Sequence, residues 1–92
     1  MRYKAELSRA AKKDMQKAPR HIVLKLWDWI QDLEDRGLPE VRKIPSYHDE
    51  PLFGDRWGQR SIRLSKSYRA FYVEKKTEIV IVKILEVNKH EY

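Results

Sequence analysis

The chain has 92 residues, with 20 lysines and arginines against 14 aspartates and glutamates, and its formal net charge is +6. A chain of this length supports one small core, so we expect a single domain over residues 1–92. The absence of cysteine excludes disulfides, thiolate zinc sites and thiol redox chemistry, and favours a reducing, cytoplasmic setting. No run of about 18 apolar residues occurs, so we expect a soluble protein without a membrane partner.

The first elements are a strand and a helix. Tyr3, Ala5 and Leu7 alternate with charged residues, the period-two pattern of a half-buried strand. Ser8 offers a helix cap, and residues 8–17 form a lysine-rich helix that ends before Pro19. This helix is expected to contribute little to the core.

A second helix is predicted between Pro19 and Gly37. Proline suits the first turn of a helix, and glycine is typical of the position just after its end. The apolar residues recur at helical spacing and predict the main contribution to the core: Val23, Leu26, Trp27, Ile30 and Leu33.

A loop and three strands complete the predicted fold. Residues 38–57 hold three prolines and a glycine, which is long for a passive connection and suggests a function. Residues 58–65, 68–74 and 78–87 are rich in β-branched and aromatic residues and are separated by polar turns at 65–67 and 75–77. We expect an α+β fold in which two helices pack on one face of a small antiparallel sheet, with the other face partly open.

Basic residues gather in two regions of the sequence. Residues 1–20 hold seven basic and two acidic residues, and residues 54–69 hold five basic residues against Asp55 alone. These five are candidates for binding a polyanion such as RNA: Arg56, Arg60, Arg63, Lys66 and Arg69. In the strand 58–65 the alternation places Arg63 opposite the core, where neighbouring arginines can grip phosphate and stabilise a pentacoordinate transition state. The alternative is an ordinary solvated strand face.

Glu50 is a candidate general base in the loop. It precedes Pro51, which favours an extended backbone, and it lies just before the basic strands. RNA can be cleaved by attack of its own 2′-hydroxyl, which must lose a proton to a base. The alternative for Asp49 and Glu50 is a turn or a pairing with nearby lysines, and His48 has a similar alternative.

The C-terminal residues offer further candidates. His90 could return a proton to the leaving 5′-oxygen, Tyr92 could stack on a base, and Lys89 adds a positive charge. The alternative is a frayed terminus. Asp49, Glu50 and Asp55 are not spaced as a metal-ligand set, and the sequence has no glycine-rich phosphate loop, so we expect neither a metal nor a cofactor.

Three segments together resemble the RelE toxin superfamily: Glu50-Pro51-Leu52, residues 60–64, and Tyr68-Arg69-Ala70-Phe71-Tyr72, followed by a closing Tyr92. The order of elements resembles it as well. The resemblance implies the RelE-like microbial ribonuclease fold and a metal-independent endoribonuclease of the RelE, YoeB and HigB kind. It also implies an antitoxin partner encoded alongside and cleavage of messenger RNA in the ribosomal A site.

The resemblance also implies roles for individual residues. Glu50 would be the general base, Arg69 the phosphate stabiliser and Tyr92 the terminal substrate contact, while Arg63 matches a basic position of the RelE branch. Apart from the resemblance, we expect five further residues to bind RNA: Arg56, Arg60, Lys66, Lys89 and His48. The YoeB branch closes on His-Tyr, whereas this chain closes on His90-Glu91-Tyr92. In a strand, a shift by one residue turns a side chain to the other face. His90 is the candidate general acid, with basic groups including Lys89 as the alternative.

Two other functions remain open at this stage. A toxin that resembles ParE would bind DNA gyrase and have no nuclease activity, because one fold can carry unrelated functions. A non-catalytic nucleic-acid-binding module would grip phosphates with an affinity that falls with salt, and would break no bond.

Overall fold

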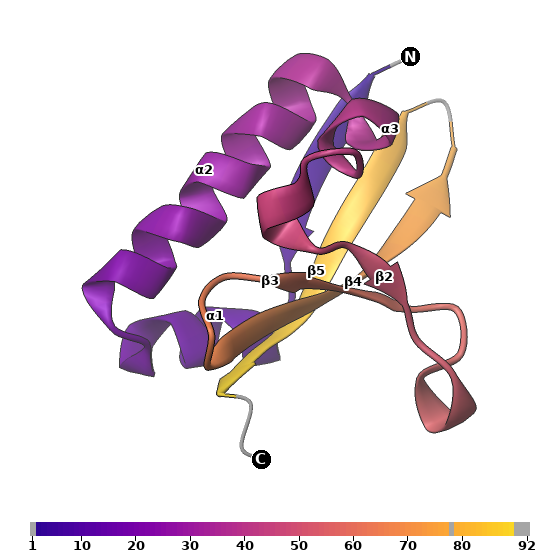
Figure 1. The fold of residues 1–92 in the computed structure, drawn as a ribbon. Coiled ribbons are helices and arrows are strands. Elements are labelled where there is room, and N and C mark those ends of the chain that lie inside the picture. Colours follow the sequence, from indigo (N-terminus) through magenta and orange to yellow (C-terminus); the bar gives the residue numbers. More distant parts are fainter. Residues whose placement is uncertain (1, 78, 90–92) are drawn as a thin grey trace.

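The computed structural model describes residues 2–77 and 79–89 and has the α+β fold that the sequence predicts (Figure 1). The expected order of strand, two helices, loop and three strands is confirmed, and short elements occupy the loop. In chain order the elements are β1 (Tyr3–Leu7), α1 (Arg9–Lys17), α2 (Arg20–Arg36), α3 (Leu38–Val41), η1 (Pro45–Tyr47), β2 (Glu50–Pro51), η2 (Gly54–Arg56), β3 (Arg60–Arg63), β4 (Tyr68–Lys76) and β5 (Val80–Lys89).

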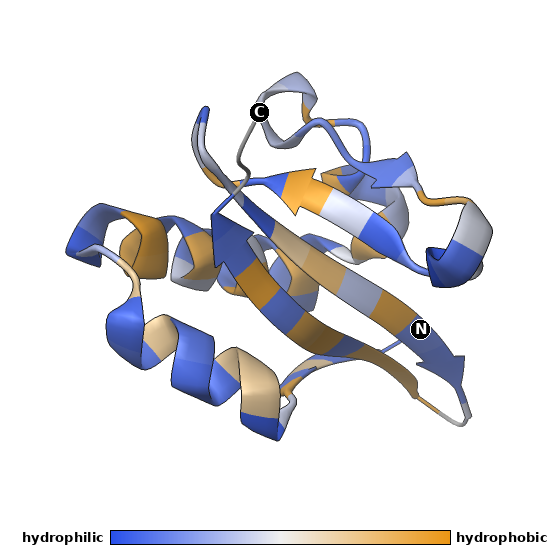
Figure 2. Ribbon diagram, turned by 90° about the horizontal axis from the view of Figure 1, so that it is seen from below, coloured by the Kyte–Doolittle hydropathy of each residue, from blue (hydrophilic) through white to orange (hydrophobic). Residues whose placement is uncertain are grey.

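The five strands form one sheet in the order β1-β5-β4-β3-β2. The pairs from β2 to β5 are antiparallel, as expected, but β1 runs parallel to β5, with Tyr3 opposite Val80 and Leu7 opposite Ile84. The sheet is therefore mixed rather than wholly antiparallel. The alternation of apolar residues, visible as banding along β4 and β5 in Figure 2, fixes which face of a strand is buried but not its direction.

The two main helices begin and end where the sequence indicates. The Ser8 hydroxyl caps α1 by accepting the N–H of Ala11 at 3.0 Å, and it also donates to the carbonyl of Leu85 in β5 at 2.7 Å. Helix α2 ends at Gly37, whose φ is +85°. A Cβ at this position would lie 2.9 Å from the Tyr3 ring, so both the backbone angle and the close approach of β1 require glycine.

Helix α2 supplies the largest share of the helical side of the core. Its buried residues are Ile22, Leu26, Trp29, Ile30 and Leu33. The expected face is therefore confirmed at Leu26, Ile30 and Leu33, whereas Val23 is only partly buried. It is wrong at Trp27, whose side chain is half exposed, while Trp29 is completely buried. The ring of Trp29 packs at 5.2 Å, between centroids, on Tyr72 of β4. The helix is rotated so that this larger contact faces the sheet.

The segment from 38 to 57 holds no long element, as predicted. Its short pieces are α3, η1, β2 and η2, and β2 is a strand of two residues at the edge of the sheet. The turn at 65–67 is confirmed, with the Ser65 hydroxyl accepting the N–H groups of Ser67 and Tyr68 at 3.1 Å. Strand β4 continues to Lys76, beyond the predicted end. Among the described residues, no helix has the length and apolar character needed to cross a membrane.

Candidate functional site

The candidate site lies on the sheet face opposite the core, here called the open face. Directly opposed residues of neighbouring strands point to the same face. Glu50, Ser61, Phe71 and Glu86 form one such row across four strands. A second row, two positions along each strand, joins Arg63, Arg69 and Asn88. Because Ala70 and Tyr72 are buried in the core on the other face, both rows lie away from the helices.

Three of the predicted site residues meet at the β2 end of the open face. Glu50 lies 3.8 Å from Arg69, measured between Oε1 and Nη1, and its Oε2 lies 3.3 Å from Nε2 of His48. His48 adopts a left-handed backbone with φ 45°, which brings its ring back toward Glu50 after η1. The side chains of Glu50 and His48 are 41% and 55% exposed, so a substrate can reach both.

Arg63 adds a second positive charge to this group. It is exposed and directly opposite Arg69 on the neighbouring strand. Like charges in opposed positions destabilise a sheet, and Glu50 is positioned to offset only part of the repulsion. A bound phosphate would relieve it. We call the four residues His48, Glu50, Arg63 and Arg69 the Glu50 cluster.

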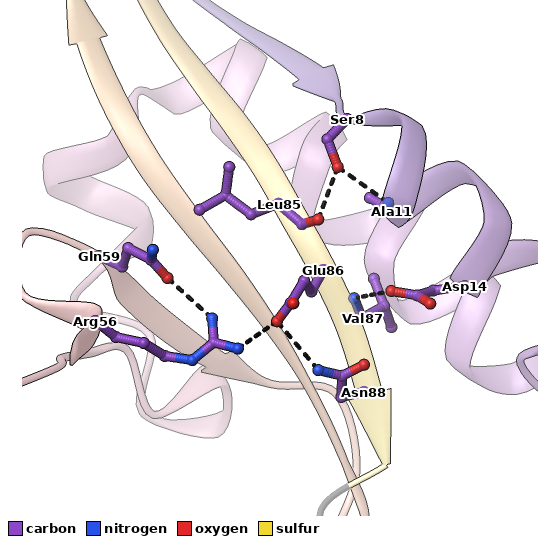
Figure 3. Close-up of polar contacts among 9 residues, drawn as sticks. All are labelled: Ser8, Ala11, Asp14, Arg56, Gln59, Leu85, Glu86, Val87 and Asn88. Carbon is purple, nitrogen blue, oxygen red and sulfur yellow. Dashed lines mark hydrogen bonds and ion pairs between the residues drawn. The ribbon is translucent and has the colours of Figure 1, made fainter.

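Arg56 reaches the open face from the loop between β2 and β3 (Figure 3). Its guanidinium pairs with Glu86, donates to the Gln59 side chain at 3.0 Å, and lies 4.2 Å over the ring of Phe71. Asn88 also donates to Glu86, at 3.2 Å. The charge of Arg56 is thus largely matched within the protein, and its side chain holds the loop on the sheet.

Arg60 does not join the Glu50 cluster, because it points to the helical face. Its Nε donates to Asp49 at 2.6 Å, and the Tyr72 hydroxyl donates to the same carboxylate at 2.5 Å. The Asp49 side chain is only 1% exposed. Arg42 donates to the Tyr72 hydroxyl at 3.4 Å and pairs with Glu74. This partly buried network fixes the residue next to Glu50, so Arg60 supports the Glu50 cluster from the helical side of the sheet.

The remaining predicted residues lie in the turn between β3 and β4, at the end of β5, or outside the described chain. Lys66 is exposed in the turn between β3 and β4. Lys89 is paired with Tyr68 at the end of β5, and with Lys17 and Asp14 it lines a small hollow beside α1. His90 and Tyr92 lie outside the described residues. Within the described chain, no group of three or more histidine, aspartate or glutamate side chains could hold a metal ion.

The buried tyrosines around the cluster predict how stability depends on alkaline pH. Burial, with Asp32 and Asp28 nearby, raises the pKa of Tyr47 from 10.0 to about 12. Burial and the hydrogen bond to Asp49 also raise the pKa of Tyr72. Since the folded pKa exceeds the unfolded one, the contribution to stability should be complete below pH 10 and be lost above it. For Tyr47 alone the loss is about 1.4 kcal/mol per pH unit up to its folded pKa.

Urea unfolding at a series of pH values between about 9 and 11.5 checks this expectation. The slope of the unfolding free energy against pH measures the number of protons that the protein releases on unfolding. In Tyr47→Phe the unfolding free energy should fall less steeply with pH, because one of the tyrosines with a raised pKa has been removed. The same slope in wild type and Tyr47→Phe would contradict the raised pKa of Tyr47.

Comparison with known proteins places the fold. No family model and no curated protein sequence matches the chain. Solved structures do match over almost its whole length. A YoeB/ParE toxin from Agrobacterium tumefaciens has a TM-score of 0.71 and 20% identity, covering 96% of this chain and 99% of the other. YafQ from E. coli has a TM-score of 0.73 and 22% identity, covering 97% and 93%. This chain has the RelE/YoeB toxin fold.

A third structure with this fold comes from an assembly with a partner. A chain of the toxin–antitoxin complex RelBE2 from Mycobacterium tuberculosis matches with a TM-score of 0.69 and 23% identity, covering 98% of this chain and all of the other. The resemblance that the sequence carries in its short motifs therefore extends to the arrangement of the whole RelE/YoeB-like fold.

Proposed function

We propose that this protein is the toxin of a type II toxin–antitoxin system and that it cleaves messenger RNA as a metal-independent endoribonuclease. The single observation that carries the proposal is the Glu50 cluster, in which an accessible carboxylate, a histidine and two arginines gather on the open face. The toxins of this fold that comparison finds support the same class of function. The proposed partners are a cognate antitoxin, messenger RNA and the ribosome, whose A site would hold the message in the cytoplasm.

The chemistry proposed for the cluster is transfer of a phosphodiester to the neighbouring 2′-oxygen. Glu50 takes the proton of the 2′-hydroxyl as that oxygen attacks phosphorus. Arg69 and Arg63 stabilise the additional negative charge of the pentacoordinate phosphorus, for which the forked guanidinium is well suited. The bond from phosphorus to the 5′-oxygen then breaks, which leaves a 2′,3′-cyclic phosphate and a 5′-hydroxyl.

The leaving 5′-oxygen needs a proton, and two histidines are candidates for supplying it. His48 lies within 3.3 Å of Glu50 and could pass on the proton that Glu50 accepts. His90 is the candidate general acid near the C-terminus, shifted by one residue from the closing His-Tyr of the YoeB branch. Replacing each histidine by glutamine in turn separates these roles. Only the replacement of the true donor should change how the cleavage rate falls at alkaline pH.

Expression of the chain alone, followed by primer extension on cellular messages, tests the proposal. We expect discrete cuts within translated regions and none with Arg69→Ala, because the variant lacks a charge that stabilises the transition state. Arg36→Ala removes an exposed arginine from the last turn of α2 and serves as the control, with cuts as in wild type. Intact messages together with arrested growth would instead favour a gyrase-binding toxin. Intact messages with normal growth would favour a binding module.

A further inference from the structure

Among the described residues, the two most exposed large aromatic residues lie side by side on the loop that joins β2 to β3. Phe53 is 70% exposed and Trp57 is 76% exposed, and their ring centroids are 5.9 Å apart at an angle of 41°. The other large exposed apolar residues, Leu24 and Trp27, are each half exposed and lie on α2. Neighbouring aromatic rings held in solvent point to a binding surface.

The loop that carries these rings is held in a defined conformation. The N–H of Leu52 donates to the carbonyl of Gln59 at 2.9 Å, and the N–H of Trp57 donates to Gly54 at 3.1 Å. Arg56 ties the same loop to Glu86 and Phe71 on the open face. The rings are therefore presented without the entropic cost of ordering a loose loop when a ligand binds.

A groove of about 550 Å³ adjoins the two rings. Besides Phe53 and Trp57 it is lined by the apolar residues Pro51 and Leu52, by Gly58, and by polar side chains that carry both donors and acceptors: Gln59, Arg60, Arg42 and Glu74. A nucleobase has two apolar faces and an edge of donors and acceptors, which matches this lining. These polar side chains already have partners within the protein: Arg60 pairs with Asp49, Arg42 with Glu74, and Gln59 accepts from Arg56. They frame the groove, and the two exposed rings supply the stacking surface.

We propose that Phe53 and Trp57 form a stacking site for an unpaired nucleobase of single-stranded RNA. The inference rests on the proposed function, since the stacked base would belong to the same strand whose phosphate is held at the Glu50 cluster. Strand β2 is the edge of the sheet and has two residues, Glu50 on the open face and Pro51 lining the groove. An RNA strand that crosses this short edge reaches both places.

Fluorescence titration with matched oligonucleotides tests the site. The probe is a 2′-O-methyl RNA of about 12 nucleotides, which lacks the attacking hydroxyl, compared with an abasic strand of equal length and charge. The protein carries Trp27→Phe, which leaves the buried Trp29 and the exposed Trp57 as the only tryptophans. We expect quenching by the RNA and none by the abasic strand.

The variants give the size of the effect. Trp57→Leu should weaken RNA binding by roughly 5- to 150-fold, the range that corresponds to one stacked base. Trp57→Phe should keep most of the affinity, because a phenyl ring still stacks. Trp27→Leu in the otherwise unchanged protein removes a half-exposed aromatic residue from α2 and should leave the affinity unchanged.

The outcomes separate this inference from the function on which it rests. Equal affinity of wild type and Trp57→Leu for the RNA, or equal quenching by the abasic strand, would overturn the stacking site. Loss of antitoxin binding in Trp57→Leu with unchanged RNA affinity would assign the groove to a protein partner and also overturn it. A wild-type protein that cuts no message would remove the proposed function itself, whatever the behaviour of Trp57.

Discussion

Glu50→Gln is expected to slow RNA cleavage by roughly 10²- to 10⁴-fold, the usual contribution of a general base. Glutamine has the same shape but cannot take the proton of the 2′-hydroxyl. The substitution also removes the negative charge that lies 3.8 Å from Arg69, so the Glu50 cluster becomes more positive. RNA affinity should therefore stay equal or increase while the rate falls. Single-turnover cleavage on programmed ribosomes, with affinity measured separately, resolves the two effects.

Glu40→Gln is the matched control for this prediction. Glu40 lies in the short helix α3, where its exposed carboxylate pairs with Lys43 at 3.3 Å. Glu40→Gln removes one negative charge and leaves the Glu50 cluster intact, so the cleavage rate of this variant should equal that of wild type. Glu50→Gln should also abolish growth arrest and still bind antitoxin, which shows that the variant is folded. Full toxicity in both Glu50→Gln and Arg69→Ala would refute the catalytic assignment.

Strand periodicity predicts the face of one candidate residue correctly. The alternation in β3 places Arg63 opposite the core, and the structure confirms its exposure. The same rule leaves Arg69 undecided, because Phe71 and Val73 share its face and are themselves apolar. The register decides the matter, since it sets Arg69 between Arg63 and Asn88 and sets Phe71 beneath Arg56. Register depends on contacts between distant segments, which a local pattern does not contain.

The adjacent carboxylates show a similar limit. In an extended segment Asp49 and Glu50 must point to opposite faces, so the sequence allows one of them to be buried and the other exposed. It does not indicate that Arg60 and Tyr72 lie beneath the loop to receive Asp49. Arg60 was expected to bind RNA because it belongs to a basic segment, and its position on the helical face was visible only in the structure. The roles of His90 and Tyr92 stay predictions.

The tryptophans of α2 explain why its buried face was partly mispredicted. Trp27 and Trp29 are two positions apart, about 200° around the helix, and apolar residues accompany both. Helix α2 therefore has two overlapping apolar faces, one with Trp27 and one with Trp29, and periodicity alone does not indicate which of them is buried. The sheet makes the choice, because Tyr72 presents a ring on which Trp29 packs. Side chains at distant positions in the sequence decide how the helix is rotated.

Trp29→Ala should be the most destabilising single substitution in α2, at about 3–5 kcal/mol. The indole is completely buried and its removal leaves a cavity against Tyr72 and the neighbouring core residues. A domain of this length is stable by roughly 5–10 kcal/mol, so the variant should unfold on the order of 20 °C below wild type or fail to fold at all. Thermal unfolding followed by circular dichroism gives the measurement.

Trp27→Ala provides the matched comparison, since it is the same change two residues away on the same helix. Trp27 is half exposed, so its loss should cost less than about 1 kcal/mol. Trp29→Phe keeps a ring against Tyr72, so its loss of stability should lie between the losses of Trp27→Ala and Trp29→Ala. Equal losses at Trp27 and Trp29 would mean that α2 is rotated differently on the sheet. Because Tyr72 also holds Asp49, a variant of Trp29 that still folds should lose cleavage activity before it loses structure.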